Sequence, residues 1–296
     1  MGFRQLYISK KAKIELNLNN IKVITENESV DIPISDIDLL FVENPNCQLT
    51  SNVIVECNKQ NVGIILCDKK YLPSTICSSL FGSNNQIELF DKQINMLQSK
   101  KDKLWEIILK QKIINHAFVI KKVYKSSLYL DFLDYSKNIK SGDKTFLEGS
   151  EARFYFRKLF GEDFIRHQDD AINLALNYGY SILNGAIVRT LVSAGLDPKI
   201  GIHHSSKKNY FNLASDFVEP YRAFVDDYVY ANKEDIIEPL SKEIRLGLIN
   251  LLNKIVVING IKTNITNSIK IFTYSFIDYM TSGNISDIKM VEFNNE

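Results

Sequence analysis

The chain has 296 residues, of which 45% are hydrophobic and 24% charged, and its formal net charge is +1. This composition is typical of a folded globular protein and excludes a uniformly polycationic nucleic-acid binder, so any DNA-binding surface has to be a local patch. The sequence has neither the apolar run of a signal peptide at its start nor the ~18 consecutive apolar residues of a membrane span, and we expect a cytoplasmic protein with no membrane partner.

Residues 1–72 have the sequence pattern of β-structure. Short β-branched runs, separated by Asn and Asp, cover 5–9, 12–16, 21–25, 29–34 and 37–42. A short helix is expected over 49–60 and a buried strand over 62–67. Several short strands in one block predict a small N-terminal β-sandwich domain.

Four cysteines lie at even intervals, at Cys47, Cys57, Cys67 and Cys77. They form no CxxC pair, and no His lies at the spacing of a zinc site, so they do not indicate a metal centre. We interpret them as buried free thiols of a reducing compartment.

A turn-rich segment follows the β block. Lys70–Ser74 contains Pro73, and Gly82–Asn85 is made of small polar residues, so we assign 73–86 as a linker. From residue 87 onward, apolar residues recur with helical spacing. The sequence therefore predicts an α+β chain in which a larger all-α catalytic domain covers 87–296.

The segment Lys100–Lys125 carries eight Lys against two acids, together with the chain's single tryptophan, Trp105. One interpretation is a solvated helix face beside a core Trp. The other is a surface that follows DNA phosphates, with Lys110 and Lys112 among its contacts. Position in the sequence leaves both interpretations open.

Local signals predict the ends of the next two helices. Thr145 and Glu148 have the spacing of a capping box, so we expect a helix from there to Gly161. One of the two acids at 169–170 can begin the following helix, and Gly195 would end it.

The remaining helices are predicted in the same way. Gly201–Asn209 is expected to be a loop, and Leu213–Glu219 a helix that Pro220 ends, because proline cannot continue a helix. Leu246–Ile258 has the pattern of one more amphipathic helix.

Histidines and acids gather in that loop and the helix after it. His203 and His204 lie shortly before Asp216 and Glu219, and these two acids, three residues apart, would share one helix face. An imidazole and carboxylates that converge on one point suit a divalent metal ion. Such an ion next to a phosphodiester is sufficient for nuclease or strand-transfer chemistry. Glu148 is a further candidate for this site.

Each candidate also has an ordinary structural interpretation. Glu148 could serve only as a helix cap, Asp216 and Glu219 could form a solvated face, and a loop histidine could have no role. The acid pairs at 169–170 and 226–227 have no nearby His in the sequence and indicate caps or surface. The chain contains no P-loop, dinucleotide-binding or GxSxG motif.

Four motifs carry a family resemblance: LEGSEARFYF at 147–156, LFG at 159–161, GIHH at 201–204 and FNLASDFVEPYR at 211–222. Together they resemble the CRISPR-associated integrase family, the first of the numbered Cas proteins, in its type II form. The resemblance implies a β N-terminal domain and a larger helical domain that holds a Mg²⁺ or Mn²⁺ site.

The resemblance also implies roles for individual residues. Glu148, His204 and Glu219 would be the catalytic metal ligands, and Asp216 matches a further acid of that site. From the residues alone, His203 is an alternative to His204. The resemblance favours His204, because its spacing to Glu219 is that of the type II form.

The activity that the resemblance implies is the insertion of captured double-stranded DNA into a CRISPR repeat array. A DNA 3′-OH would attack a phosphodiester at the repeat boundary, with Lys207, Lys208 and Arg222 beside DNA phosphates. The family pattern implies a homodimer, joined to a second one by a central dimer of the second Cas protein. In type II systems, a DNA-end ring protein and the effector nuclease would collaborate.

Two other functions are compatible with the same residues. The chain could be a stand-alone metal-dependent nuclease for branched DNA, in which water replaces the 3′-OH. It could also be a non-catalytic DNA-binding scaffold, in which the polar cluster only stabilises the helical domain.

Overall fold

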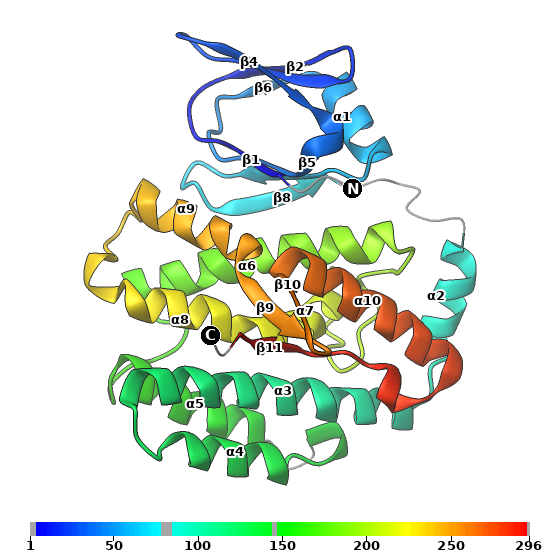
Figure 1. The fold of residues 1–296 in the computed structure, drawn as a ribbon, viewed down its shortest axis with the longest axis vertical. Coiled ribbons are helices and arrows are strands. Elements are labelled where there is room, and N and C mark those ends of the chain that lie inside the picture. The colour runs from blue at the N-terminus through cyan, green and yellow to red at the C-terminus, as the bar shows by residue number, and fades with distance from the viewer. Residues whose placement is uncertain (1–3, 78–84, 144–146, 295–296) are drawn as a thin grey trace. The chain divides into compact units, whose positions relative to one another are not determined.

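The computed structural model describes residues 4–77, 85–143 and 147–294, and the chain divides into two compact units, Met1–Asn84 and Asn85–Glu296 (Figure 1). Strands dominate the first unit and helices dominate the second. This organisation confirms the predicted fold class, a small β domain followed by a larger, mostly helical domain.

Two four-stranded sheets form the N-terminal unit, in the orders β1-β5-β7-β8 and β4-β3-β2-β6. Their strands are β1 (Arg4–Ile8), β2 (Lys13–Asn17), β3 (Asn20–Ile24), β4 (Ser29–Pro33), β5 (Ile37–Val42), β6 (Gln48–Leu49), β7 (Gly63–Cys67) and β8 (Pro73–Cys77). The helical segments are η1 (Ile34–Asp36) and α1 (Ser51–Lys59).

Both sheets contribute to one apolar core. Ile14 and Ile21 come from the second sheet, Leu40 and Ile64 from the first, and Val53 from α1, and all five are buried in the same cluster. β5 is buried along its whole length, and it is a central strand that pairs in parallel with β1 on one side and with β7 on the other. This shared core is what the predicted sandwich requires.

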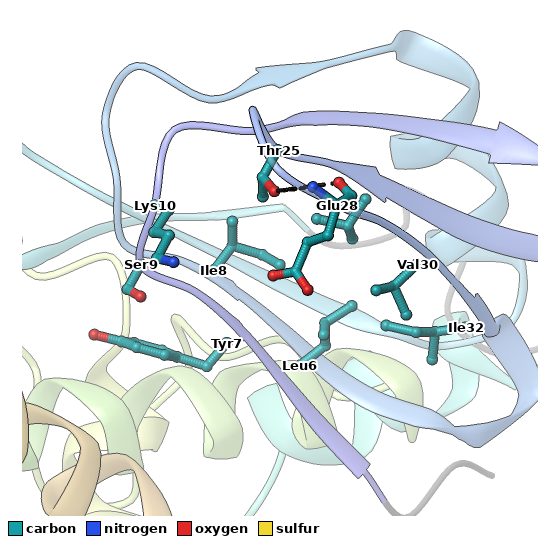
Figure 2. A pocket seen from close by; sticks show the side chains of 10 residues that line it. Leu6, Tyr7, Ile8, Ser9, Lys10, Thr25, Glu28, Val30 and Ile32 are labelled. Atoms are coloured by element: carbon teal, nitrogen blue, oxygen red, sulfur yellow. Dashed lines mark hydrogen bonds between the residues drawn. The ribbon is translucent and has the colours of Figure 1, made fainter.

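A pocket of about 310 Å³ lies on the N-terminal unit beside β1, β3 and β4 (Figure 2). Its lining is mostly apolar, with Glu28 and Lys10 as its charged members. Figure 2 shows Thr25 hydrogen-bonded to the backbone of Glu28 in the turn between β3 and β4. The pocket brings together no set of catalytic side chains.

The segment 73–86, predicted as a linker, contains the strand β8, and the boundary between the two units falls after Asn84. β8 pairs antiparallel with β7, with Ile76 opposite Ile65. Pro73 is a turn signal in the sequence, but β8 is an edge strand, where a proline is tolerated at the first position.

All four cysteines are free thiols, as predicted. Cys57 on α1 is buried, and this burial raises the pKa of its thiol to about 12. Cys47, Cys67 and Cys77 are only half-buried. Complete burial therefore holds for Cys57 alone.

The C-terminal unit is built around helix α3 (Gln98–Tyr124), which contacts α4, α5, α7, α8 and η3. A second long helix, α6, contacts α7, α8, α9 and α10. The α-helices besides α3 are α2 (Gln86–Ile94), α4 (Tyr129–Asn138), α5 (Leu147–Phe160), α6 (Ala171–Ser193), α7 (Asn212–Val218), α8 (Arg222–Ala231), α9 (Lys242–Asn250) and α10 (Ile265–Ser282). The 3-10 turns are η2 (Ser141–Asp143), η3 (Glu219–Tyr221), η4 (Lys233–Asp235), η5 (Leu251–Asn253) and η6 (Ile285–Asp287).

A small antiparallel sheet lies within this unit, so the domain is not entirely α-helical. It has the order β10-β9-β11, from β9 (Ile255–Ile258), β10 (Ile261–Asn264) and β11 (Val291–Phe293). The helix predicted over Leu246–Ile258 is therefore wrong beyond α9. Its second half is a β-branched run that enters a two-residue hairpin, and Asn259 and Gly260 both have the positive φ that this turn requires.

Several helix ends agree with the sequence signals. Asp170 caps α6 by accepting a hydrogen bond from the Asn173 N–H, and Gly195 has a φ of 89° just after that helix. Pro220 behaves differently: it lies in η3, and α8 begins immediately afterward, so the chain continues helically with a change of pitch. Thr145 lies outside the described residues. No helix that the structure describes is long and apolar enough to cross a membrane.

Candidate active site

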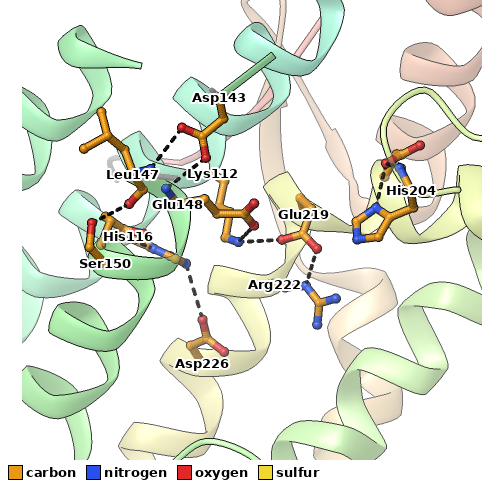
Figure 3. A network of polar contacts seen from close by, with 12 residues as sticks. Lys112, His116, Asp143, Leu147, Glu148, Ser150, His204, Glu219, Arg222 and Asp226 are labelled. Carbon is orange, nitrogen blue, oxygen red and sulfur yellow. Dashed lines mark hydrogen bonds and ion pairs between the residues drawn. The ribbon is translucent and has the colours of Figure 1, made fainter. Parts of the chain in front are cut away.

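Three separate segments, α3, α5 and η3, bring charged side chains together. Glu148 is in the first turn of α5, Glu219 begins η3, and Lys112 projects from the middle of α3 (Figure 3). The start of α5 is fixed by Asp143, which accepts hydrogen bonds from the N–H groups of Leu147 and Glu148 at 3.0 and 3.2 Å. This carboxylate satisfies helix N–H groups that otherwise lack partners, and it holds Glu148 in place.

Lys112 joins the two predicted acidic ligands. Its Nζ lies 2.7 Å from Glu148 Oε1 and 2.7 Å from Glu219 Oε2 (Figure 3). The Lys112 side chain is only 7% exposed, and that of Glu219 5%. Burial by itself would lower the pKa of this lysine, but Glu219 and Glu148 outweigh burial and raise it. Lys112 is therefore charged, and it serves as the shared cation of the two carboxylates.

Arg222 completes the charge balance at Glu219. Its Nε donates to Glu219 Oε1 at 3.0 Å. Burial would raise the pKa of Glu219, but Arg222 and Lys112 prevail and lower it to about 2. The cluster thus contains two carboxylates and two cations, and its formal charge is zero.

Asp216 organises the histidine loop. Its Oδ2 accepts from the N–H groups of Ile202 and His203 at 2.6 and 3.2 Å, and its Oδ1 accepts from the N–H of His204 at 3.0 Å. The same Oδ1 lies 2.7 Å from His204 Nδ1. Gly201 allows this wrapping, since a Cβ there would lie 2.1 Å from the carbonyl oxygen of His204.

These contacts show that Asp216 positions the histidine loop, and the metal-ligand role that the resemblance allows for it stays a prediction. The side chain is fully buried, and both of its oxygens already accept hydrogen bonds from the loop. A carboxylate only accepts hydrogen bonds, so a neutral His204 carries its proton on Nδ1 and keeps the Nε2 lone pair available. The pKa of His204 is raised, chiefly by the Asp216 hydrogen bond against the opposing effect of burial.

The two histidines have different surroundings, and these favour His204 as the ligand. His203 stacks flat on Trp105, with ring centroids 4.3 Å apart and an angle of 1° between the rings. His204 meets Trp105 edge-on, and the charges of Glu219 and Glu148 act on its imidazole. Trp105 thereby holds the loop through its stacking with His203. His204 is the histidine whose imidazole interacts electrostatically with both Glu219 and Glu148.

The carboxylates of Glu148 and Glu219 and the imidazole of His204 are donor types that suit a divalent ion. The contact of both acids with Lys112 bears on whether such an ion fits between them. The carboxylates of Glu148 and Glu219 converge on the Nζ of Lys112, and a metal ion at that point would be within reach of both. Glu219 Oε2 is buried and accepts no well-aligned hydrogen bond, although Lys112 Nζ is close by. Within 4–77, 85–143 and 147–294, however, no three His, Cys, Asp or Glu side chains are gathered closely enough to hold a metal. The residues fit the ion chemically, and Lys112 stands where it would bind.

The other predicted DNA contacts fall into two groups. Lys110 forms a 2.6 Å ion pair with Glu106, and Lys112 is buried between acids, so neither presents a free charge to DNA. These pairs argue against a direct phosphate contact by Lys110 or Lys112. Lys207 and Lys208 are exposed on the loop after His204.

A second polar layer, which the sequence motifs do not indicate, lies one helical turn from the first. His116, four residues after Lys112 on α3, lies with its Nδ1 2.8 Å from Glu151 Oε1 and its Nε2 3.9 Å from Asp226 Oδ2. Asp226 also accepts a hydrogen bond from the Tyr180 hydroxyl. All of these side chains are buried, so the interpretation of Asp226 as surface or cap is wrong. The signal available in the sequence was helical spacing. His116 follows Lys112 by four residues on α3, and Glu151 follows Glu148 by three residues on α5.

A basic pocket of about 360 Å³ runs along the exposed face of α5 and the loop after it. Arg153, Arg157 and Arg166 line it together with Phe156 and Phe164, and none of its described lining residues is acidic. Its first lining residue directly follows Glu148 in the sequence. Guanidinium groups beside aromatic rings are the features that hold phosphates and bases of single-stranded DNA.

Residues 6–239 match the family described as CRISPR associated protein Cas1. The chain belongs to this family. It is 32% identical, over 226 residues, to the CRISPR-associated endonuclease Cas1 of Neisseria meningitidis serogroup C (strain 8013), covering 76% of this chain and 74% of that protein. The predicted family is therefore confirmed.

Solved structures have the same fold. A casposase bound to integration product matches with a TM-score of 0.78 at 20% identity, covering 96% of this chain and 92% of that one. A chain of a Cas6-RT-Cas1–Cas2 complex matches with a TM-score of 0.75 at 18% identity, covering 97% of this chain and 36% of that longer one. At these identities the likeness establishes the fold, and the chemistry has to be argued from the residues.

Proposed function

We propose that this chain is a divalent-metal-dependent DNA integrase of CRISPR adaptation. It inserts captured DNA into the repeat array when a DNA 3′-OH attacks a phosphodiester at the repeat boundary. The observation that carries this proposal is the convergence of Glu148 and Glu219 on one cation, beside a histidine whose tautomer Asp216 fixes. Membership of a family whose relative is named an endonuclease, and the fold of a casposase bound to integration product, support it.

Glu148, His204 and Glu219 would hold Mg²⁺ or Mn²⁺. When bound, the ion would polarise the phosphoryl oxygen and offset the charge that develops there. The chain's own residues prepare this position: Asp216 aims the imidazole, and Asp143 fixes the first turn of α5. Exact placement of groups around a reacting phosphate is the protein's main contribution to such chemistry.

The DNA would pass over the surface near these ligands. The arginine pocket along α5 and the exposed Lys207 and Lys208 supply positive charge there, while the buried Lys112 does not. A local patch of this kind is compatible with a chain whose formal net charge is only +1.

The proposed assembly is a homodimer that binds Cas2. The solved complex whose name joins Cas1 to Cas2 contains a chain of this fold, which supports Cas2 as the partner. The motif at 211–222 resembles the type II form, and on that basis we propose the type II DNA-end ring protein and effector nuclease as collaborators.

One experiment separates this function from the two alternatives. The protein, Cas2, duplexes with 3′-OH ends and a repeat-bearing plasmid are incubated with Mn²⁺ or with EDTA, and a His204→Ala variant is run alongside. Metal-dependent joining that the variant loses is the expected result. Cutting without joining would indicate a stand-alone nuclease, and DNA binding with no metal-dependent product would indicate a scaffold.

A further inference from the structure

The buried ammonium of Lys112 lies between the two acids that are proposed as metal ligands. Its Nζ is 2.7 Å from an oxygen of each, which is the separation of a close ion pair. The lysine comes from α3, the acids from α5 and η3, so this one side chain links three segments. Without a cation at this point, two carboxylates would face each other in a largely buried setting, where like charges repel strongly.

The charge balance of the cluster bears on how it receives a metal. Glu148 and Glu219 are matched by Lys112 and Arg222, so the cluster is neutral as it stands. A divalent ion that entered beside the lysine would gain little net attraction and would be repelled by the ammonium at close range. The ion and the ammonium compete for the same carboxylate oxygens.

We propose that Lys112 is a resident cation of this site, which holds Glu148 and Glu219 together without metal and is displaced when a divalent ion binds. The exchange leaves the site with excess positive charge, since the tethered ammonium stays nearby. DNA phosphates supply the negative charge that compensates it. Metal binding is therefore coupled to DNA binding, and the site takes up its ion chiefly when a substrate is present.

This inference rests on the proposed function, since it concerns the regulation of the same metal site. A coupling between two ligands is reciprocal and commonly amounts to about 5–150-fold in affinity. The direct probe is Mn²⁺, whose free concentration is read from its electron paramagnetic resonance signal without any turnover. Mn²⁺ affinity is measured with and without a non-reacting DNA duplex, for the wild type and for three variants.

The variants isolate the charge of Lys112. Lys112→Met removes the ammonium and keeps the length of the side chain, Lys112→Arg keeps the charge, and Lys110→Met removes a lysine that pairs with Glu106 elsewhere on the same helix. We expect Lys112→Met to bind Mn²⁺ at least about tenfold more tightly than the wild type in the absence of DNA, and to lose most of the gain that DNA gives. Lys110→Met should stay close to the wild type, and Lys112→Arg, which keeps a cation at the site, should bind Mn²⁺ less tightly than Lys112→Met.

Two results would overturn the inference while leaving the proposed function intact. One is a wild-type Mn²⁺ affinity that DNA does not change, a measurement that needs no variant to fold. The other is a Lys112→Met protein, or Lys112→Gln if the Met variant does not fold, that binds Mn²⁺ no more tightly than the wild type. If the wild type binds no Mn²⁺ even with DNA, the proposed metal-dependent function fails as well.

Discussion

Asp216 accepts hydrogen bonds from both the backbone N–H and the Nδ1 of His204, at 3.0 and 2.7 Å. One carboxylate therefore fixes the path of the loop and the orientation of the imidazole together. A carboxylate behind a metal-binding histidine is a common arrangement, because it sets the tautomer and raises the basicity of the ligating nitrogen.

Replacing Asp216 by Asn should weaken the site without removing a ligand. We expect metal affinity and DNA joining to fall about 10–100-fold, the usual effect of losing such a support. The pKa of His204 should fall as well, because the Asp216 hydrogen bond is the main cause that raises it. Nuclear magnetic resonance titration of the His204 ring measures this directly. An unchanged His204 pKa would contradict the positioning role.

Adding a single methyl group at Gly201 should disrupt the same loop. A Cβ there would lie 2.1 Å from the His204 carbonyl oxygen and 3.0 Å from Asp216 Oδ2, so the loop has to move. We expect Gly201→Ala to cost about 1–3 kcal/mol of stability, as overpacking commonly does, and to reduce joining. Gly149→Ala is the matched control, since its added methyl meets nothing within 4 Å. Thermal melts of the two variants compare the effects, and equal melting temperatures would refute the packing argument.

Acid should weaken the carboxylate cluster in a defined pH window. The pKa of Glu219 is lowered from 4.5 to about 2, so its contribution to stability is complete above pH 4.5 and is lost as pH falls toward 2. At pH 6, Glu219→Gln should be about 3–5 kcal/mol less stable than the wild type, because it leaves a buried cation short of a partner. Urea titrations at several pH values should show this difference shrinking toward pH 2. A constant difference would mean that the pKa of Glu219 is the same in the folded and unfolded protein, which would contradict the lowered value.

The arginine pocket should contribute to DNA affinity through its interactions with phosphates. Arg153→Ala and Arg157→Ala should each weaken binding of single-stranded DNA, and each should reduce the slope of log affinity against log salt by about 0.7 for one phosphate left without its arginine. Lys137→Ala is the control, since this exposed lysine pairs with Asp134 on α4. Fluorescence anisotropy at several salt concentrations measures both quantities. Affinities that fall equally in all three variants would assign no special role to the pocket.

The sequence predicts the fold where its local signals are strong. The β-branched runs of the first 67 residues, the Asp170 cap and Gly195 all have direct counterparts in the structure. Prediction fails at β9, where the hydrophobic pattern suits either a helix or a strand. The pair Asn259-Gly260 is the decisive signal there, because its turn geometry requires a hairpin.

The candidate site can be predicted only in part, since motifs give residue types and not their partners. The motifs identify Glu148, Glu219 and His204, but the contacts of Lys112 depend on how α3 packs against α5 and η3. A lysine within a basic helical run has the sequence pattern of a surface residue. Only the tertiary fold shows that it is buried between two acids.

The proposed function requires that Glu148, His204 and Glu219 form one metal site for DNA joining. The most direct test is a joining assay with Mn²⁺, Cas2, a 3′-OH duplex and a repeat-bearing plasmid, on Glu148→Ala, His204→Ala and Glu219→Ala. We predict that all three variants lose joining, as EDTA-treated wild type does, while circular dichroism and DNA binding stay near the wild type. Joining at the wild-type rate by folded samples of these variants would contradict it.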